Sequence, residues 1–125
     1  MQIQSISGIF FLALLLLGCQ NESKQESTNL VGFWEIQEAY RNRQFTESLD
    51  ELFFEFFEDG TMRTNITGIP DDATYTFSKN KIEQRESDLD IDYTIQNLSD
   101  STLNLTTSIR DFNFRFLLVK RIPQE

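Results

Sequence analysis

The sequence predicts an all-β domain, a meander of short antiparallel strands that closes into a sandwich or a barrel. Apolar and polar residues alternate with a period of two through most of the chain after residue 30, as they do on strands with one buried face. Small clusters of turn-forming residues separate the apolar segments. Ten of the twelve phenylalanines, the tryptophan and all three tyrosines follow Gly18, and these large rings provide buried area for a small core.

Eight segments are expected to form the strands. The first alternates around Trp34, and the last has an apolar residue at every second position from Phe112 to Leu118. Asp59-Gly60, a dipeptide favoured in tight hairpin turns, joins the second segment to the third. Residues 68–72 contain a proline followed by two aspartates and are expected to be a loop. The expected strands are residues 31–37, 52–57, 61–66, 74–77, 81–85, 91–95, 102–106 and 112–120.

The second of these segments also has features of a helix. Residues 48–51 have the pattern of a capping box, and apolar residues recur after it at helical spacing. A helix would leave Phe54 on the exposed face, whereas a strand aligns it with Leu52 and Phe56 and leads directly into the turn. We therefore expect a strand here, preceded by a helical turn at residues 46–51.

The chain begins with an apolar segment that predicts a secretory signal. Residues 9–17 are all apolar, but a membrane-spanning helix needs roughly 20 such residues, and a shorter run that ends at small residues is typical of a signal peptide. Leu16-Leu17-Gly18-Cys19 resembles the lipobox of bacterial lipoproteins. This resemblance implies that residues 1–18 are removed, that Cys19 carries a lipid, and that residues 19–29 form a flexible tether to a membrane. A buried cysteine in an N-terminal helix is the alternative.

Other roles for Cys19 conflict with the composition. The chain has no histidine, which removes the commonest base that activates a cysteine nucleophile. One cysteine without histidine leaves only carboxylates to bind a metal, so we expect neither a metal site nor a cofactor. The net charge of −9 argues against nucleic acid or anionic lipid as a partner, because binding to either requires positive charge. Residues 30–125 are expected to form one small domain.

Short motifs along residues 30–121 resemble those of the small lipocalin-like lipoproteins of Gram-negative bacteria. Residues 30–34 are similar to the Gly-x-Trp opening of lipocalin-like domains, and residues 56–61 to the apolar strand and acidic turn that follow it. Residues 93–106 match the family's late hairpin, and residues 119–121 its basic end. The resemblance implies an eight-stranded antiparallel up-and-down barrel of the calycin type.

The same resemblance assigns roles to individual residues. It places Gly32 and Trp34 at the closed end of the barrel, with Arg121 or Lys120 against the indole ring. Trp34 as an ordinary core residue beside a solvated Arg121 is the alternative. An eight-stranded barrel is either filled by side chains or holds one small ligand, so the inward-facing rings are the candidates for binding a small hydrophobic molecule. These rings are Phe54, Phe56, Tyr75, Phe77, Tyr93, Phe114 and Phe116.

Residues 38–51 would then form a long first loop over the open mouth of the barrel. The loop mixes aromatic and cationic side chains, which is unusual in so acidic a chain, and we expect contact with a ligand or a protein there. A solvated connection with a few anchoring rings is the alternative. The candidates are Tyr40, Arg41, Arg43 and Phe45.

The acidic side chains do not define a catalytic or metal site. Asp88, Asp90 and Asp92 alternate, but an EF-hand loop also needs a glycine and a glutamate where Tyr93 and Ser99 stand. We expect these aspartates on the outer face of a strand. No spacing selects a carboxylate pair for glycoside hydrolysis, so we expect a protein that is not an enzyme.

The sequence as a whole predicts an exported, lipid-anchored lipocalin-like protein of the cell envelope, with the outer membrane favoured, that binds a small hydrophobic ligand inside its barrel. The alternative is a ligand-free envelope module that acts by protein–protein contact.

Overall fold

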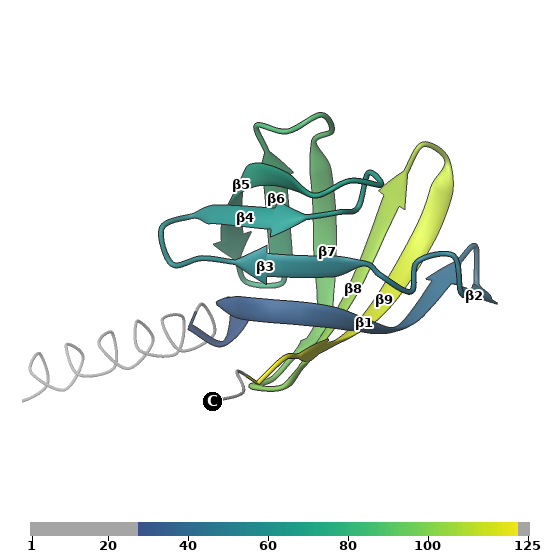
Figure 1. Ribbon diagram of the computed structural model, residues 1–125, viewed down its shortest axis with the longest axis horizontal. Helices are drawn as coiled ribbons and strands as arrows, with labels where there is room; N and C mark the ends of the chain where they lie inside the picture. The colour runs from purple at the N-terminus through teal and green to yellow at the C-terminus, as the bar shows by residue number, and fades with distance from the viewer. Residues whose placement is uncertain (1–27, 123–125) are drawn as a thin grey trace, which may run out of the picture.

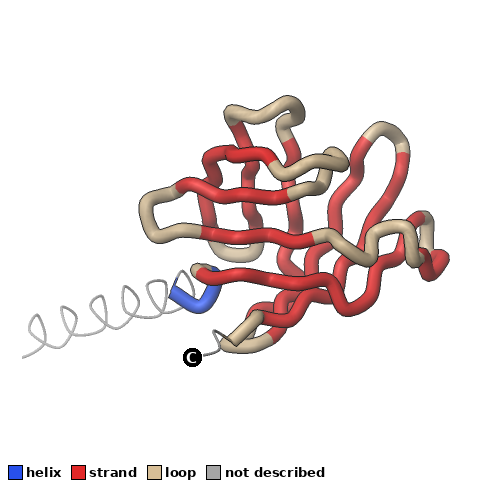
Figure 2. Tube along the Cα trace, in the orientation of Figure 1, coloured by secondary structure: helices blue, strands red, loops and turns tan. Residues whose placement is uncertain are grey.

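The computed structural model describes residues 28–122, and nearly all of them belong to strands or to the short connections between strands (Figure 1, Figure 2). A single helical turn at residues 28–30 precedes the first strand. The strands are β1 (Gly32–Arg41), β2 (Gln44–Thr46), β3 (Phe53–Phe56), β4 (Thr61–Thr64), β5 (Asp71–Ser78), β6 (Lys81–Arg85), β7 (Ile91–Leu98), β8 (Thr102–Ile109) and β9 (Phe112–Lys120).

Eight of these strands form a closed antiparallel barrel. Each strand from β3 to β9 pairs with the next, and β1 pairs with β3 on one side and with β9 on the other. β2 is an additional short strand that pairs with the end of β1. All eight strands expected from the period-two pattern are present, and the predicted up-and-down barrel is confirmed.

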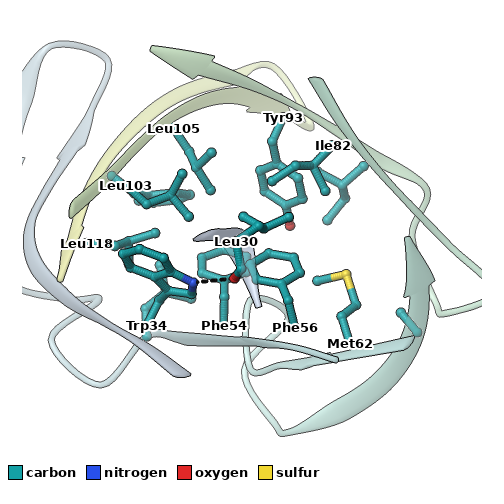
Figure 3. Packing of buried hydrophobic residues seen from close by; sticks show 14 of the residues in the cluster. Leu30, Trp34, Phe54, Phe56, Met62, Ile82, Tyr93, Leu103, Leu105 and Leu118 are labelled. Atoms are coloured by element: carbon teal, nitrogen blue, oxygen red, sulfur yellow. Dashed lines mark hydrogen bonds between the residues drawn. The ribbon is translucent and has the colours of Figure 1, made fainter. Parts of the chain in front are cut away.

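The barrel has two different ends. The β3–β4, β5–β6 and β7–β8 connections lie at one end, which we call the closed end, together with residues 28–31. Leu30 from this segment is fully buried and lies in the middle of the core side chains in Figure 3. At the other end, which we call the open end, lie residues 42–52 and the β4–β5, β6–β7 and β8–β9 connections. The closed end is therefore covered by the chain that enters β1.

The alternation of side chains along the strands places the apolar residues inside the barrel. On β7, Ile91 and Tyr93 are buried while Asp92 and Thr94 are exposed, as expected for a strand with one face toward the core. The buried core contains Leu30, Trp34, Ala39, Leu52, Phe54, Phe56, Met62, Ala73, Ile82, Ile91, Tyr93, Leu103, Leu105, Phe116 and Leu118. Every buried side-chain nitrogen and oxygen of residues 28–122 has a hydrogen-bond partner.

The segment with mixed helical and strand features is a strand. β3 covers Phe53–Phe56 and buries Phe54 and Phe56, as the strand interpretation predicts. The helical features extend only to a turn, in which the amide of Leu52 donates to the carbonyl of Leu49 at 3.1 Å. Burial of alternate rings on a strand therefore prevails over the capping pattern.

Three local expectations are wrong. Residues 38–51 are not one long loop, because β1 continues to Arg41 and pairs with β2 as a hairpin. Asp71 and Asp72 belong to β5, where they pair with β4, rather than to the loop after Pro70. Asp88 and Asp90 lie in the β6–β7 connection, so only Asp92 of the three aspartates is on the outer face of a strand.

The described part of the chain contains no helix of the length and apolarity needed to span a membrane. The predicted signal peptide, Cys19 and the greater part of the predicted tether lie outside residues 28–122.

Candidate functional site

The closed end is organised around Trp34. Its indole is fully buried, and the ring N–H donates to the carbonyl oxygen of Leu30 at 2.8 Å (Figure 3). This bond satisfies the one polar group of the side chain and fixes the helical turn across the end of the barrel.

Lys120, rather than Arg121, lies against the Trp34 ring. The Lys120 Nζ is 5.0 Å from the ring centroid and donates to the carbonyl oxygen of Asn29 at 2.8 Å. A Cβ atom at Gly32 would lie 3.1 Å from the Lys120 Cε, and the φ of +142° at Gly32 also disfavours a larger residue. Glycine is thus required where the lysine stem crosses β1. The guanidinium of Arg121 instead stacks on Phe33, 4.2 Å from its centroid, and forms an ion pair with Glu35.

The aromatic residues expected to line a ligand cavity fall into two groups. Phe54, Phe56, Tyr93 and Phe116 are at most 1% exposed, whereas Tyr75, Phe77 and Phe114 are half-buried and pack against the core. The Phe54 ring lies at the centre of the first group, with centroids 5.4 Å from Tyr93, 6.1 Å from Phe56 and 6.2 Å from Phe116. These separations are those of directly packed rings, so the rings occupy the middle of the barrel themselves.

A hydrogen-bond network that begins in the core lies beside these rings and extends to the partly exposed Ser87. The Tyr93 hydroxyl donates to the Gln84 Oε1 at 2.7 Å, and the Gln84 Nε2 donates to the Ser87 hydroxyl at 3.2 Å. The Ser87 hydroxyl donates in turn to the carbonyl oxygen of Leu89 at 3.0 Å. Burial raises the pKa of Tyr93 well above its usual value, so the phenol stays neutral and remains a donor. The network ties the β6–β7 connection at the open end to the core.

The open end contains an apolar pocket, which we call the mouth pocket. Its volume is about 190 Å³. Leu89 and Ile91 line one side, from the β6–β7 connection and the start of β7. The remaining lining residues are Ile66, Thr67, Ile109 and Arg110, from the β4–β5 and β8–β9 sides. Four of its six side chains are aliphatic, and polar atoms also contribute to the exposed lining.

The four residues expected in a loop over the mouth belong instead to the β1–β2 hairpin, and they do not form one site. Tyr40 and Arg43 face a groove on the outside of the barrel. Arg41 lies over the ring of Phe112, 5.7 Å from its centroid, and Phe45 packs edge-on against Tyr40 at 5.9 Å. Phe45 is still 57% exposed.

The groove on the outside of the barrel has a volume of about 800 Å³, and we call it the wall groove. It runs from Arg85 on β6 across β7, β8 and β9 to Tyr40 and Arg43 of the hairpin. Most of its side chains alternate with core residues on their strands and so belong to the outer face. The other lining residues are Asp90, Asp92, Thr94, Thr106, Thr107, Ser108, Asn113, Phe114 and Arg115.

The sequence matches the family model of the lipocalin-like domain over residues 30–105, which is more than half of the chain. The chain belongs to the lipocalin-like domain family. The match begins at Leu30 and includes Trp34, the two residues whose hydrogen bond lies across the closed end of the barrel.

A solved structure supports the same fold. The crystal structure of a lipocalin-like protein from Bacteroides uniformis is similar to this chain with a TM-score of 0.56 and 15% sequence identity. The similarity covers 74% of this chain and 99% of the other. At this identity the likeness shows the fold alone. No curated protein is significantly similar to this chain in sequence.

Several polar residues of this lipocalin-like domain were not identified as site residues from the sequence. Gln84 is 1% exposed, although alternation with Ile82 on the inner face of β6 was a signal that could have indicated its burial. Thr94, Thr106 and Arg115 of the wall groove occupy ordinary outward positions on their strands. Nothing in the sequence distinguishes them, because the groove depends on how the strands diverge.

Within residues 28–122, the lipocalin-like domain has no group of three or more aspartate, glutamate, cysteine or histidine side chains arranged to hold a metal ion.

Proposed function

We propose that this lipocalin-like domain binds a small apolar ligand in the mouth pocket at the open end of its barrel. The observation that supports this proposal is the apolar lining by Ile66, Leu89, Ile91 and Ile109 directly beyond the packed rings. Apolar surface that faces a small pocket favours an apolar occupant over water.

The volume limits the ligand. About 190 Å³ is below the range of about 300 to 1,000 Å³ that is usual for drug-sized ligands. Deeper entry would require the rings of Phe54 and Tyr93 to move, and those rings are fully buried. A short alkyl chain fits this space, and Arg110 at its edge suits a carboxylate at the end of that chain. A short-chain fatty acid is therefore the ligand class that we propose.

The experiment is a titration of hexanoate into the protein, followed by the NMR shifts of backbone amides. We expect shifts at residues 66–67, 89–91 and 109–110. Ile66→Trp fills the pocket and should abolish the shifts, whereas Ile69→Trp, on the same connection but 70% exposed and outside the pocket, should leave them unchanged. Equal binding to both variants would refute the mouth pocket as the site.

We also propose that the domain has no enzymatic activity. The mouth pocket is lined by four aliphatic residues, a threonine and an arginine, without a carboxylate that could act as a general acid or base. A binding role needs only shape and apolar surface, which this lining provides.

Export and lipid anchoring at Cys19 are proposals that rest on the sequence, because Leu16-Leu17-Gly18-Cys19 resembles a lipobox. The domain would then be held in the cell envelope, at the outer membrane in the favoured case. Expression of the whole chain in a Gram-negative host should give a protein that fractionates with membranes and incorporates labelled fatty acid. Cys19→Ser should remove the label, and a label that persists in this variant would contradict anchoring at Cys19.

A second candidate function is contact with another envelope protein through the β1–β2 hairpin. The observation that favours it is the exposure of two large rings, Phe45 on β2 and Phe112 on β9. Both strands pair with the end of β1, and the rings are 57% and 45% exposed. Exposed aromatic side chains are typical anchors of protein interfaces. Cross-linking from position 45 in intact cells, compared with position 57 at the closed end, tests this candidate, which predicts an adduct from position 45 alone.

A further inference from the structure

We propose that the wall groove is a second binding site, separate from the mouth pocket, for a small ligand that carries a carboxylate or phosphate group. The groove lies on the outer face of the barrel and is lined by different residues from the mouth pocket. This second proposal does not depend on the function proposed for the mouth pocket.

The groove exists because β7 and β8 diverge toward the open end. The β7–β8 ladder extends only from Leu98↔Leu103 to Thr94↔Thr106, with an irregularity between Ile95 and Asn97. The β8–β9 ladder continues further, to Ile109↔Phe112, so the β8–β9 hairpin leans away from β7 (Figure 1). The opening brings Phe114 and Thr107 of the inner face into the groove lining.

A side-chain bond holds the diverging strands. The Thr107 hydroxyl donates to the carbonyl oxygen of Asp92 at 2.8 Å, where a ladder bond is missing. A single side-chain bond in place of a ladder leaves the strands apart without leaving that carbonyl unpaired. The Thr107–Asp92 bond therefore stabilises the separation of β7 and β8 that forms the groove.

The charge in the groove is opposite to that of the protein. Arg43, Arg85 and Arg115 line it together with Asp90 and Asp92, which gives a formal charge of 3 − 2 = +1 in a chain of net charge −9. The Arg85 guanidinium bonds Asp92 at 2.9 Å, and this contact raises the pKa of Arg85. The carboxylate of Asp92 is thus neutralised by its own partner.

Arg43 and Arg115 lack such a partner. Within residues 28–122, no carboxylate lies in ion-pair distance of either guanidinium. The Arg115 guanidinium is stacked on the Tyr40 ring, 4.4 Å from its centroid, and the Tyr40 hydroxyl is fixed by donation to Glu38 at 2.5 Å. The guanidinium also hydrogen-bonds the Tyr40 side chain. Stacking and this bond hold the plane of the guanidinium, and its remaining N–H groups can bind a planar or tetrahedral anion.

The side chains between the arginines are short and polar. Thr94 on β7, Thr106 and Ser108 on β8, and Asn113 on β9 line the groove. The Ser108 hydroxyl already donates to the Asn113 Oδ1 at 2.7 Å, which leaves the amide N–H groups of Asn113 and the threonine hydroxyls as donors. Such groups can bond the remaining polar atoms of a hydroxyl-bearing acid. The class that fits is a small hydroxylated carboxylate or phosphate.

The test uses citrate and glycerol 3-phosphate as probes, with glucose as the uncharged comparison, in NMR titrations at low ionic strength. We expect both anions to shift the amides of residues 92–94, 106–108 and 113–115, and glucose to shift none. Binding should weaken several-fold near 0.15 M salt, where the screening length is about 8 Å. Absence of shifts with both anions would overturn the proposal, as would shifts confined to the mouth residues.

Matched variants locate the site. Arg115→Gln and Arg43→Gln should each weaken anion binding about ten-fold, as expected for the loss of one charge-assisted contact. Arg63→Gln on β4, which removes the same charge from an arginine paired with Asp72 outside the groove, should have no such effect. Ile66→Trp should leave anion binding intact and so separates this proposal from the mouth pocket. Equal loss in the Arg63 variant would show nonspecific attraction and overturn the site.

Vesicles identify the source of the anionic group. Sedimentation with phosphatidylglycerol vesicles, set beside the titration with glycerol 3-phosphate, distinguishes a lipid headgroup from a free metabolite. Co-sedimentation that is lost in Arg115→Gln supports the groove as a headgroup site, and soluble binding alone supports a free ligand. Failure of both forms to bind overturns the proposal.

Discussion

At the scale of the residue, the closed end depends on Lys120 and its contact with Trp34. The lysine combines a cation–π contact at 5.0 Å with a hydrogen bond to the Asn29 carbonyl. Lys120→Met keeps the apolar stem beside Gly32 and removes both polar contacts. We expect a loss of about 1 to 2 kcal/mol in the free energy of unfolding, measured by chemical denaturation. Arg121→Met is the control and should cost less, because its ion pair with Glu35 is solvent-exposed.

A second residue-scale prediction concerns Tyr93. Tyr93→Phe would leave the buried Gln84 Oε1 without its donor, which costs about 1 to 3 kcal/mol of stability. Adding Gln84→Met should restore part of this loss, because the acceptor is then removed as well. Chemical denaturation of the two variants measures these changes in the free energy of unfolding. A single Tyr93→Phe variant as stable as the parent protein would show that the network does not stabilise the fold.

Residue roles could be predicted from the sequence only where a motif defines them. Gly32 and Trp34 are at the closed end as the resemblance implies, but the choice between Arg121 and Lys120 depends on which of two adjacent residues points inward. β9 ends at Lys120, which faces the indole, while Arg121 follows the strand and faces Phe33. One position of difference reverses the side of the sheet, so the assignment requires the register.

At the scale of the element, the β3–β4 hairpin is fixed by its turn. The Asp59 carboxylate accepts bonds from the Thr61 hydroxyl at 2.6 Å and the Thr61 amide at 3.0 Å. These bonds lower the pKa of Asp59, with the hydroxyl contributing most. The carboxylate therefore stabilises the fold at pH values above its unfolded pKa, about 3.9, and this stabilisation is lost as the pH falls through the lower folded value.

Asp59→Ala tests this turn. We expect a lower melting temperature than that of the parent protein at neutral pH, and a difference that shrinks as the pH falls below about 4, the unfolded pKa of aspartate. Melting curves across this pH range measure the difference directly. A difference that stays constant down to the acid limit would mean that the Asp59 charge has no part in the turn.

The strands were predictable because period two is a local signal, and eight of the nine come from it. β2 was not, since its three residues, Gln44 to Thr46, are too few to show a period and are defined only by their pairing with β1. The start of β5 at Asp71 has the same origin, because pairing of Asp71 and Asp72 with β4 extends the strand into an acidic segment. Pairing with the preceding strand, rather than the pattern of the segment itself, decides where such elements begin.

At the scale of the whole molecule, the barrel separates two surfaces of different chemistry. The rings fill its middle, an apolar mouth pocket opens at one end, and a polar groove crosses the outer wall. The sequence predicted the barrel and the inward rings, but neither pocket could be located from it. Both depend on connections and on the divergence of β7 from β8, which involve residues far apart in the chain.

The central claim is that the barrel interior is packed and that its apolar binding space lies at the mouth. Crystals of the protein under xenon pressure test this most directly, because xenon occupies apolar cavities and is readily located. We expect xenon between Ile66, Ile91 and Ile109 and none among Phe54, Phe56, Tyr93 and Phe116. Xenon bound among those four rings, with none at the mouth, would contradict the account.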